Sequence, residues 1–268
     1  MKYIDSHAHL SQGDYALDLD ETINKAVRND VIHIIDNADS LDSFENVLNT
    51  KKAYPNIIKA AIGIHPEFSG KGEDYLNTAI DFITSHIDQI DAIGECGLDY
   101  HYLNGTSKED ELNTFRVMAS IAKKYNKPLV VHSREAFDDT YSILKEIRPD
   151  KIQLHCFCYS KEEAKQLIDL GLNIKFSFGG VLTFKNSAIN QEAMLSIPED
   201  MLMLETDSPC LSPMPYRGKR NEPSYIPLIF DKICSLKNLK SFEERNSLAD
   251  KLYLSLIHIS EPTRPISI

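Results

Sequence analysis

Side chains that can bind a metal ion recur at the ends of short apolar runs in this chain. In residues 92–100, AIGECGLDY, such a run delivers the carboxylate of Glu95, and a second acid follows at Asp99. The other runs end in the same residue types: His7, His9, His132, His155, Glu205 and Asp207. An HxH pair on a strand turns both rings to one face, but an isolated HxH is a weak signal. Ligand-type residues at five strand ends are not expected by accident and predict a metal site.

This set of nitrogen and oxygen ligands, without a thiolate, suits divalent ions such as Mg, Mn or Zn. Six residues are the candidate ligands: His7, His9, Glu95, His132, His155 and Asp207. They exceed the needs of one ion, so we predict two. Glu95 is the natural bridge, because a carboxylate offers two oxygens and an imidazole one usable lone pair. Two neighbouring ions hold a bridging hydroxide at neutral pH, which predicts hydrolysis.

The elements that must position these residues alternate along the chain. Eight β-branched runs predict strands at residues 2–9, 31–38, 57–64, 90–95, 128–132, 151–156, 173–178 and 201–206. Amphipathic stretches predict helices at residues 16–28, 41–53, 75–87, 108–125, 136–147, 161–170, 189–195, 227–236 and 242–253. The alternation predicts an α/β fold, a (β/α)8 TIM barrel, in one domain spanning residues 1–253. Its metal site would lie at the C-terminal ends of the strands. An open doubly wound sheet is the alternative.

Composition limits the partners. The net charge of −11 argues against gripping long duplex DNA through its phosphates. The one dense basic cluster, Arg217, Lys219 and Arg220, is either a solvated surface turn or a local phosphate clamp. We expect neither a membrane span nor a signal peptide, and no obligate protein partner. The five cysteines are odd in number, which favours reduced thiols and a cytoplasmic location.

Seven ordered motifs together resemble the TatD-type DNase family of the metal-dependent hydrolase superfamily. They are DSHAHL at residues 5–10, GIHP at 63–66, GECGLDY at 94–100, VVHSRE at 130–135, LHCF at 154–157, LETDSP at 204–209 and RGKRNEP at 217–223. The resemblance covers residues 1 to about 253. It implies a divalent-metal phosphodiesterase that acts on DNA ends or single-stranded DNA, with 3′ to 5′ exonuclease activity.

The resemblance also implies a role for each matching residue. One ion would be held by His7, His9, Glu95 and Asp207, and the other by Glu95, His132 and His155. The catalytic residues would be Asp207 as general base and then acid, Glu95 as bridge, and Glu205, which orients a ligand or water. The substrate phosphates would be bound by Arg134, Arg217 and Arg220, with Glu222 fixing the loop by ion pairing. His65 would either donate to a substrate phosphate or serve as a loop histidine that orients another group.

Two segments depart from the family pattern. After His155 the family usually has a small flexible turn, HCFSG, whereas this chain continues with Cys156, Phe157, Cys158 and Tyr159. The departure puts the loop in doubt, and not the ligand. Residues 254–264 match the translation of a transposase-type sequencing adapter. We therefore expect residues 254–268 to be a non-native, irregular tail.

Two other function classes remain open. An amidohydrolase-like enzyme acting on a small amide, lactone or phosphoester would use the same barrel and HxH pair. Many such enzymes bridge their ions with a carbamylated lysine, and residues 92–100 contain no lysine. A non-catalytic metal-binding protein would be expected to have lost ligands, and none of the six is lost.

Overall fold

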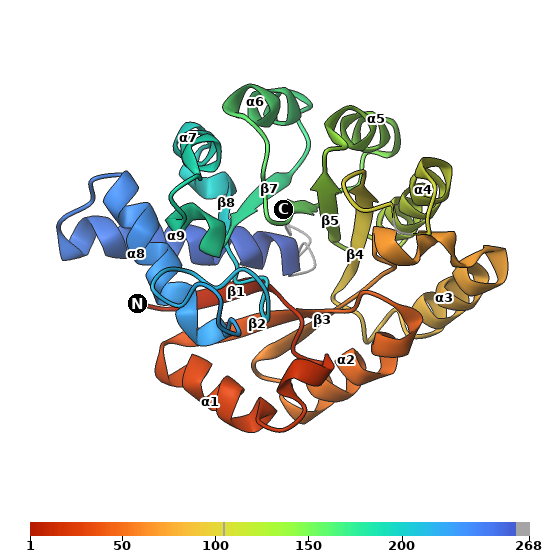
Figure 1. Cartoon of the computed structure of the whole chain (residues 1–268), viewed down its shortest axis with the longest axis horizontal. Coiled ribbons are helices and arrows are strands. Elements are labelled where there is room, and N and C mark those ends of the chain that lie inside the picture. The colour runs from red at the N-terminus through yellow and green to blue at the C-terminus, as the bar shows by residue number, and fades with distance from the viewer. Residues whose placement is uncertain (104, 261–268) are drawn as a thin grey trace, which may run out of the picture.

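A computed structural model describes residues 1–103 and 105–260 of the chain. Its eight strands form one parallel sheet in sequential order, β1 to β8 (Figure 1). The strands are β1 (Tyr3–Ala8), β2 (Val31–Asn37), β3 (Ile58–Ile62), β4 (Ala92–Asp99), β5 (Leu129–Arg134), β6 (Ile152–Leu154), β7 (Ile174–Phe178) and β8 (Leu202–Leu204). The sheet curls into a nearly closed barrel, which confirms the predicted (β/α)8 architecture.

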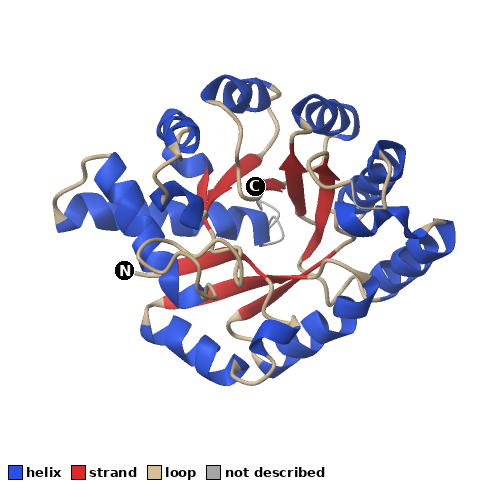
Figure 2. Ribbon diagram, viewed as in Figure 1, coloured by secondary structure: helices blue, strands red, loops and turns tan. Residues whose placement is uncertain are grey.

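Helices surround the barrel, as Figure 2 shows. They are α1 (Leu19–Arg28), α2 (Leu41–Ala53), α3 (Glu73–Ser85), α4 (Lys108–Lys124), α5 (Phe137–Ile147), α6 (Lys161–Asp169), α7 (Ala188–Ser196), α8 (Ile226–Leu236) and α9 (Phe242–Ser260). Capping boxes begin three of them, α2, α4 and α6. Ser107 Oγ accepts from the Asp110 amide at 3.2 Å, and Ser160 Oγ accepts from the Glu163 amide at 3.2 Å. These local signals fix where α4 and α6 begin.

The inside of the barrel is layered. At the end where the strands begin, the inward side chains form an apolar cluster of Ile4, Ile35, Ala61, Ala92, Val130 and Met203, against which Tyr253 of α9 packs. Above it Gln153 Nε2 donates to Ser6 Oγ at 3.0 Å and to Ser177 Oγ at 3.2 Å. A hydrogen-bonded polar layer therefore separates the apolar end from the end that carries the predicted ligands, although Gln153 Oε1 has no hydrogen-bond partner among the described residues.

Hydrogen bonds between β1 and the segment after β8 close the barrel. The Asp207 amide donates to the His7 carbonyl at 2.9 Å, and the His9 amide donates to the Ser208 carbonyl at 2.8 Å. The only bridge between these segments within the described residues pairs Ala8 with Ser208. Closure itself thus brings Asp207 beside His7 and His9, at the end of β1.

The close approach of β4 to β5 explains why Gly97, the second glycine in the GECGLDY motif, must be glycine. Its φ is +146°, and a Cβ atom on it would lie 1.9 Å from the His132 carbonyl oxygen. Only glycine therefore lets β4 approach β5 at this ligand.

The prediction of an irregular tail is wrong for residues 254–260, because α9 continues to Ser260. The first proline after the predicted helix is Pro262, and a proline at that position does not prevent a helix from ending two residues earlier, at Ser260. Ser255 is 1% exposed and donates to the Asp200 carbonyl at 2.9 Å. Residues 261–268 lie outside the described residues, and an adapter origin of the tail stays a prediction.

None of the helices in the described ranges has both the length and the apolar character that crossing a membrane requires.

Candidate metal centre

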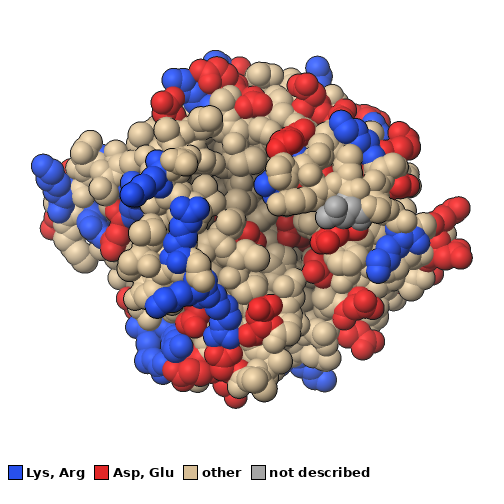
Figure 3. All heavy atoms as spheres, in the orientation of Figure 1, with Lys and Arg blue, Asp and Glu red and all other residues tan. Residues whose placement is uncertain are grey.

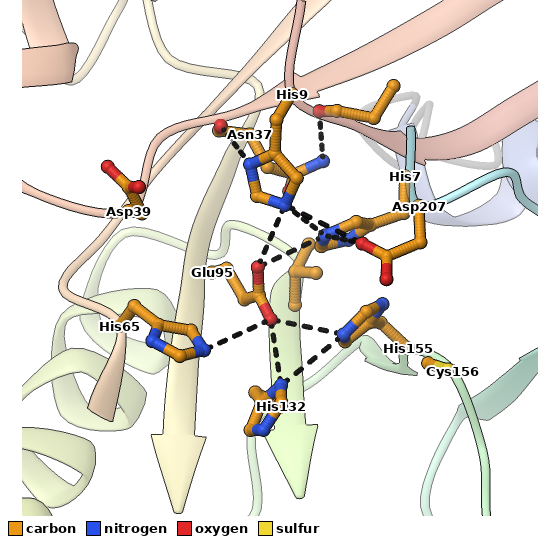
Figure 4. Close-up of polar contacts among 12 residues, drawn as sticks. His7, His9, Asn37, Asp39, His65, Glu95, His132, His155, Cys156 and Asp207 are labelled. Atoms are coloured by element: carbon orange, nitrogen blue, oxygen red, sulfur yellow. Dashed lines mark hydrogen bonds and ion pairs between the residues drawn. The ribbon is translucent and has the colours of Figure 1, made fainter. Parts of the chain in front are cut away.

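Glu95 lies at the centre of the predicted ligands, and its two oxygens face different partners (Figure 4). Oε2 lies 3.1 Å from His7 Nε2 and 3.3 Å from His9 Nε2. Oε1 lies 3.0 Å from His132 Nδ1 and 3.1 Å from His155 Nε2. The carboxylate is 3% exposed, so water does not compete for it. One carboxylate therefore divides four histidines into two pairs.

Asp207 completes the His7 and His9 side of the cluster. Its Oδ1 lies 3.9 Å from His7 Nε2 and 3.7 Å from His9 Nε2. The φ angle of Asp207 is +58°, a left-handed conformation that residues other than glycine seldom adopt. Strained backbone is common at functional sites, where the surrounding structure holds it in place.

In His9 and His132, the ring nitrogen that faces away from Glu95 has a hydrogen-bond partner of its own. His9 Nδ1 donates to the Asn37 carbonyl at 2.9 Å, and His132 Nε2 donates to Asp99 Oδ2 at 3.0 Å. When such a ring is neutral, its inner nitrogen points a lone pair at an oxygen of Glu95. Two acceptors at this distance repel each other unless a cation or a proton lies between them. The residues therefore fit a metal centre of the kind in which carboxylates and carbonyls orient ligand histidines.

His155 lies beside Glu205, which follows β8. Its Nδ1 lies 3.5 Å from Glu205 Oε2. Glu205 is fully buried, accepts from the Cys156 amide at 2.7 Å and also accepts from the Ser177 hydroxyl. These contacts fix Glu205 beside His155, and its orienting role stays a prediction. The Cys156 amide is part of them, so the unusual loop after β6 leaves His155 in place.

Electrostatics keep the carboxylate of Glu95 ionised. Burial opposes ionisation of Glu95, but the neighbouring His155 and His7 hold its pKa well below the ordinary value. Burial likewise opposes charge on His9, but contacts with Glu95 raise the pKa of that ring to about 9. Burial raises the pKa of Asp207, so this carboxylate is the more basic one. Asp207, the more basic carboxylate, therefore lies beside the ionised carboxylate of Glu95.

Three overlapping groups in the described residues bring at least three ligand atoms within 4.8 Å of one another: His7, His9 and Glu95; His65, Glu95 and His132; His7, His155 and Asp207. Each of the six predicted ligands belongs to at least one of these groups.

His65, predicted to bind substrate, also lies close to Glu95, with 3.8 Å between its Nε2 and Glu95 Oε1. Burial lowers the pKa of His65 to about 4, which keeps the ring neutral and able to donate or to bind an ion.

Two orienting groups were missed in the sequence, Asp99 and the Asn37 carbonyl. Asp99 had a readable signal, because it follows Glu95 by four residues on one strand and so shares its face. The Asn37 carbonyl had none, since a main-chain oxygen leaves no trace in residue types.

The predicted phosphate-binding arginines differ in their surroundings. Arg220 pairs with Asp18 at 2.6 Å and with Glu222 at 3.3 Å, as predicted for Glu222. Its guanidinium is thus largely occupied inside the protein. Arg134 and Arg217 form no ion pair within the described part of the chain. Their role in substrate binding, like that of Arg220, stays a prediction.

Two cavities open at the cluster. One, of about 370 Å³, is lined by His132, Ser133, Arg134, His155, Cys156, Cys158, Val181, Asp207, Cys210 and Leu211. The other, of about 260 Å³, is lined by His65, Glu67, Asp99 and Tyr102. Figure 3 shows the hollow at this end, with basic side chains gathered toward α1 and α8 and mainly acidic ones toward α3 and α4.

The chain is similar to known metal-dependent hydrolases. Residues 4–252 match the family model described as TatD related DNase. The uncharacterized metal-dependent hydrolase YabD of Bacillus subtilis is 36% identical over 258 residues, which are 96% of this chain and 99% of that protein. The crystal structure of YJJV, a TatD homolog from Escherichia coli, has a TM-score of 0.88 at 25% identity, covering 97% of this chain and 98% of that one. A lactonase from Listeria monocytogenes, at 14% identity and a TM-score of 0.64 over 98% of this chain and 95% of that one, shares the fold.

Proposed function

Because the chain belongs to the TatD related DNase family and is a metal-dependent hydrolase, we propose that it hydrolyses phosphodiester bonds of DNA. Single strands and frayed 3′ ends are the proposed substrates, and two divalent ions the proposed cofactors. The observation that carries the proposal is the division of four histidines between the two oxygens of Glu95. A cytoplasmic location stays a prediction.

The residues of the chain have separate tasks in this proposal. Divalent ions, when bound, activate water and neutralise charge on a phosphate. His7 and His9 on one side of Glu95, and His132 and His155 on the other, would hold them. Asp207, with its raised pKa, accepts the proton of the attacking water and returns it to the leaving oxygen.

The substrate phosphates would be held by the two unpaired arginines. Arg134 lines the cavity that contains His132, His155 and Asp207, so it reaches a phosphate at the centre. Arg217 is exposed on the loop between β8 and α8. A guanidinium binds two phosphate oxygens at once, which fixes the orientation of the diester. Few such contacts suit a protein of net charge −11, and we expect a shallow salt dependence.

The test is a metal titration against a substrate panel. Metal-depleted protein is supplied with Mg, Mn, Zn or Co and assayed on 3′- and 5′-end-labelled single-stranded DNA, the matching duplex, RNA of the same sequence and a lactone panel. We expect stepwise shortening of the single-stranded DNA from the 3′ end. Turnover of lactones without cleavage of any oligonucleotide would refute the nuclease proposal and favour the amidohydrolase-like alternative.

A further inference from the structure

Resting on the proposed nuclease function, we propose that Tyr102, backed by Arg134, is a binding surface for a nucleobase next to the cleaved phosphate. Tyr102 follows β4, and its ring lies over the Arg134 guanidinium, with 4.8 Å between the guanidinium carbon and the ring centroid. The residue is 52% exposed. Its hydroxyl makes no hydrogen bond within the described residues. The ring is thus held at the surface by the Arg134 guanidinium and by a T-shaped contact with the His101 ring, with 4.5 Å between the ring centroids, and not by burial.

The position of Tyr102 connects it to the metal centre. It lines the 260 Å³ cavity together with His65 and Asp99, and Nε2 of that histidine lies 3.8 Å from Glu95. Arg134, on the other side of the stack, lines the 370 Å³ cavity with His132, His155 and Asp207. The stacked pair therefore stands between the two cavities, at the rim of the cluster where a phosphate would bind.

Asp99 fixes the tyrosine relative to that cluster. Its Oδ2 accepts from His132 Nε2 at 3.0 Å, while its Oδ1 accepts from the amides of His101 and Tyr102 at 3.0 and 3.1 Å. One carboxylate therefore positions both a predicted metal ligand and the main chain that carries the aromatic ring. A ring tied in this way is oriented before the substrate binds, which lowers the entropic cost of binding.

A nucleobase is the ligand that this surface fits. Every base has a flat face that stacks on an aromatic ring, whichever base it is, and the guanidinium adds a cation–π contribution. Leu103 beside it is 38% exposed and extends the apolar surface. A single strand whose bases point outward and whose phosphate points inward needs apolar contacts at the rim and polar groups at the centre. Tyr102 and Leu103 provide the first, and the metal-ligand cluster provides the second.

The experiment compares intact with abasic substrates. Three single-stranded DNAs are compared. One has a tetrahydrofuran abasic site on the 5′ side of the first cleaved phosphate, the second has it on the 3′ side, and the third is intact. Steady-state kinetics with the metal-loaded full chain are measured for the wild type, Tyr102→Phe, Tyr102→Leu and Tyr102→Ala. Tyr125→Ala is the matched control, because Lys124 lies 5.0 Å from the Tyr125 ring at the far end of α4.

For the intact strand we expect Tyr102→Ala to raise KM by about tenfold, the order of one lost base–aromatic contact, with kcat little changed. Tyr102→Leu should behave similarly, and Tyr102→Phe and Tyr125→Ala like the wild type. At one of the two abasic positions the wild type should show the same rise in KM, and Tyr102→Ala no further rise. An equal effect of Tyr102→Ala on intact and on both abasic strands would overturn the inference and leave the nuclease function standing. Failure of the wild type to cleave any strand would overturn both.

Discussion

Replacing Asp99 by asparagine should weaken one metal site without disturbing the fold. The two oxygens of Asp99 accept from two sets of donors, His132 Nε2 and the amides of His101 and Tyr102. Asparagine keeps the size of the side chain but has one acceptor oxygen. Whichever way the amide turns, one set of donors meets an NH2 group. If the NH2 group faces His132, the ring must move its proton to Nδ1, toward Glu95, and can no longer bind an ion there.

The loss of metal affinity can be estimated from the usual effect of removing a group that orients a metal ligand. Removing such a partner lowers metal affinity or activity by about 10- to 100-fold, or about 1.4 to 2.7 kcal/mol. In the native protein burial opposes ionisation of Asp99, yet the His132 contact holds its pKa below the ordinary value. The charge that asparagine removes is therefore present at neutral pH. We expect one of the two proposed sites to weaken by this factor and the other to keep its affinity.

The assay is titration of metal-depleted protein against a chelating dye, with circular dichroism to follow folding. Asp39→Asn is the matched control, because this carboxylate also follows a strand end near the cluster but accepts from Gln12, Ser40 and Ser43 (Figure 4). Equal affinities in Asp99→Asn and the wild type at both sites would refute the orienting role. A similar loss in Asp39→Asn would show that the effect is general electrostatics.

Four further outcomes are expected. Glu95→Gln should reduce bound metal from two equivalents to at most one, by elemental analysis, and turnover by more than about a hundredfold, with a nearly unchanged melting temperature. Arg217→Ala should raise KM and lower the salt slope by about 0.7, one phosphate contact, whereas Arg220→Ala should mainly lower the melting temperature, because its guanidinium already pairs with acids. Burial raises the pKa of Asp36 to about 6, so the wild type should gain stability over Asp36→Asn as pH falls from about 6.5 to 4, by at most about 3 kcal/mol in chemical denaturation. Deleting residues 254–268 should leave turnover unchanged and cost about 1 kcal/mol of stability for the buried hydroxyl contact that is lost.

The barrel could be predicted because its signals are local. Alternation of β-branched runs with amphipathic stretches gave eight strands in order, and the position of each histidine at a strand end placed it at one end of the barrel. Errors concentrated where a local signal was weak. β6 and β8 are three residues each, shorter than the apolar runs that predicted them. α9 runs to Ser260 because nothing before Pro262 stops a helix.

The partners of charged groups could not be predicted in the same way. Arg217 and Arg220 stand three residues apart in one basic loop, and their spacing is the same whether they face solvent or acids. Asp18, which pairs with Arg220, lies about two hundred residues away in the chain and meets it only after the barrel closes. Whether a guanidinium is available to a ligand is thus a property of closure, not of composition.

Closure also accounts for the asymmetry of the centre. The histidines lie on β5 and at the ends of β1 and β6, strands whose pairing begins well before the ligand. Asp207 instead belongs to the segment after β8, and its own amide donates to the His7 carbonyl. Its carboxylate reaches the cluster only when the last strand meets the first. The proposed proton acceptor therefore depends on the complete barrel, while the Glu95, His132 and His155 side rests on adjacent strands β4, β5 and β6. A substitution that weakens the contact between β8 and β1 should therefore reduce metal binding by His7, His9 and Asp207 first. Glu95, His132 and His155 should still bind their ion.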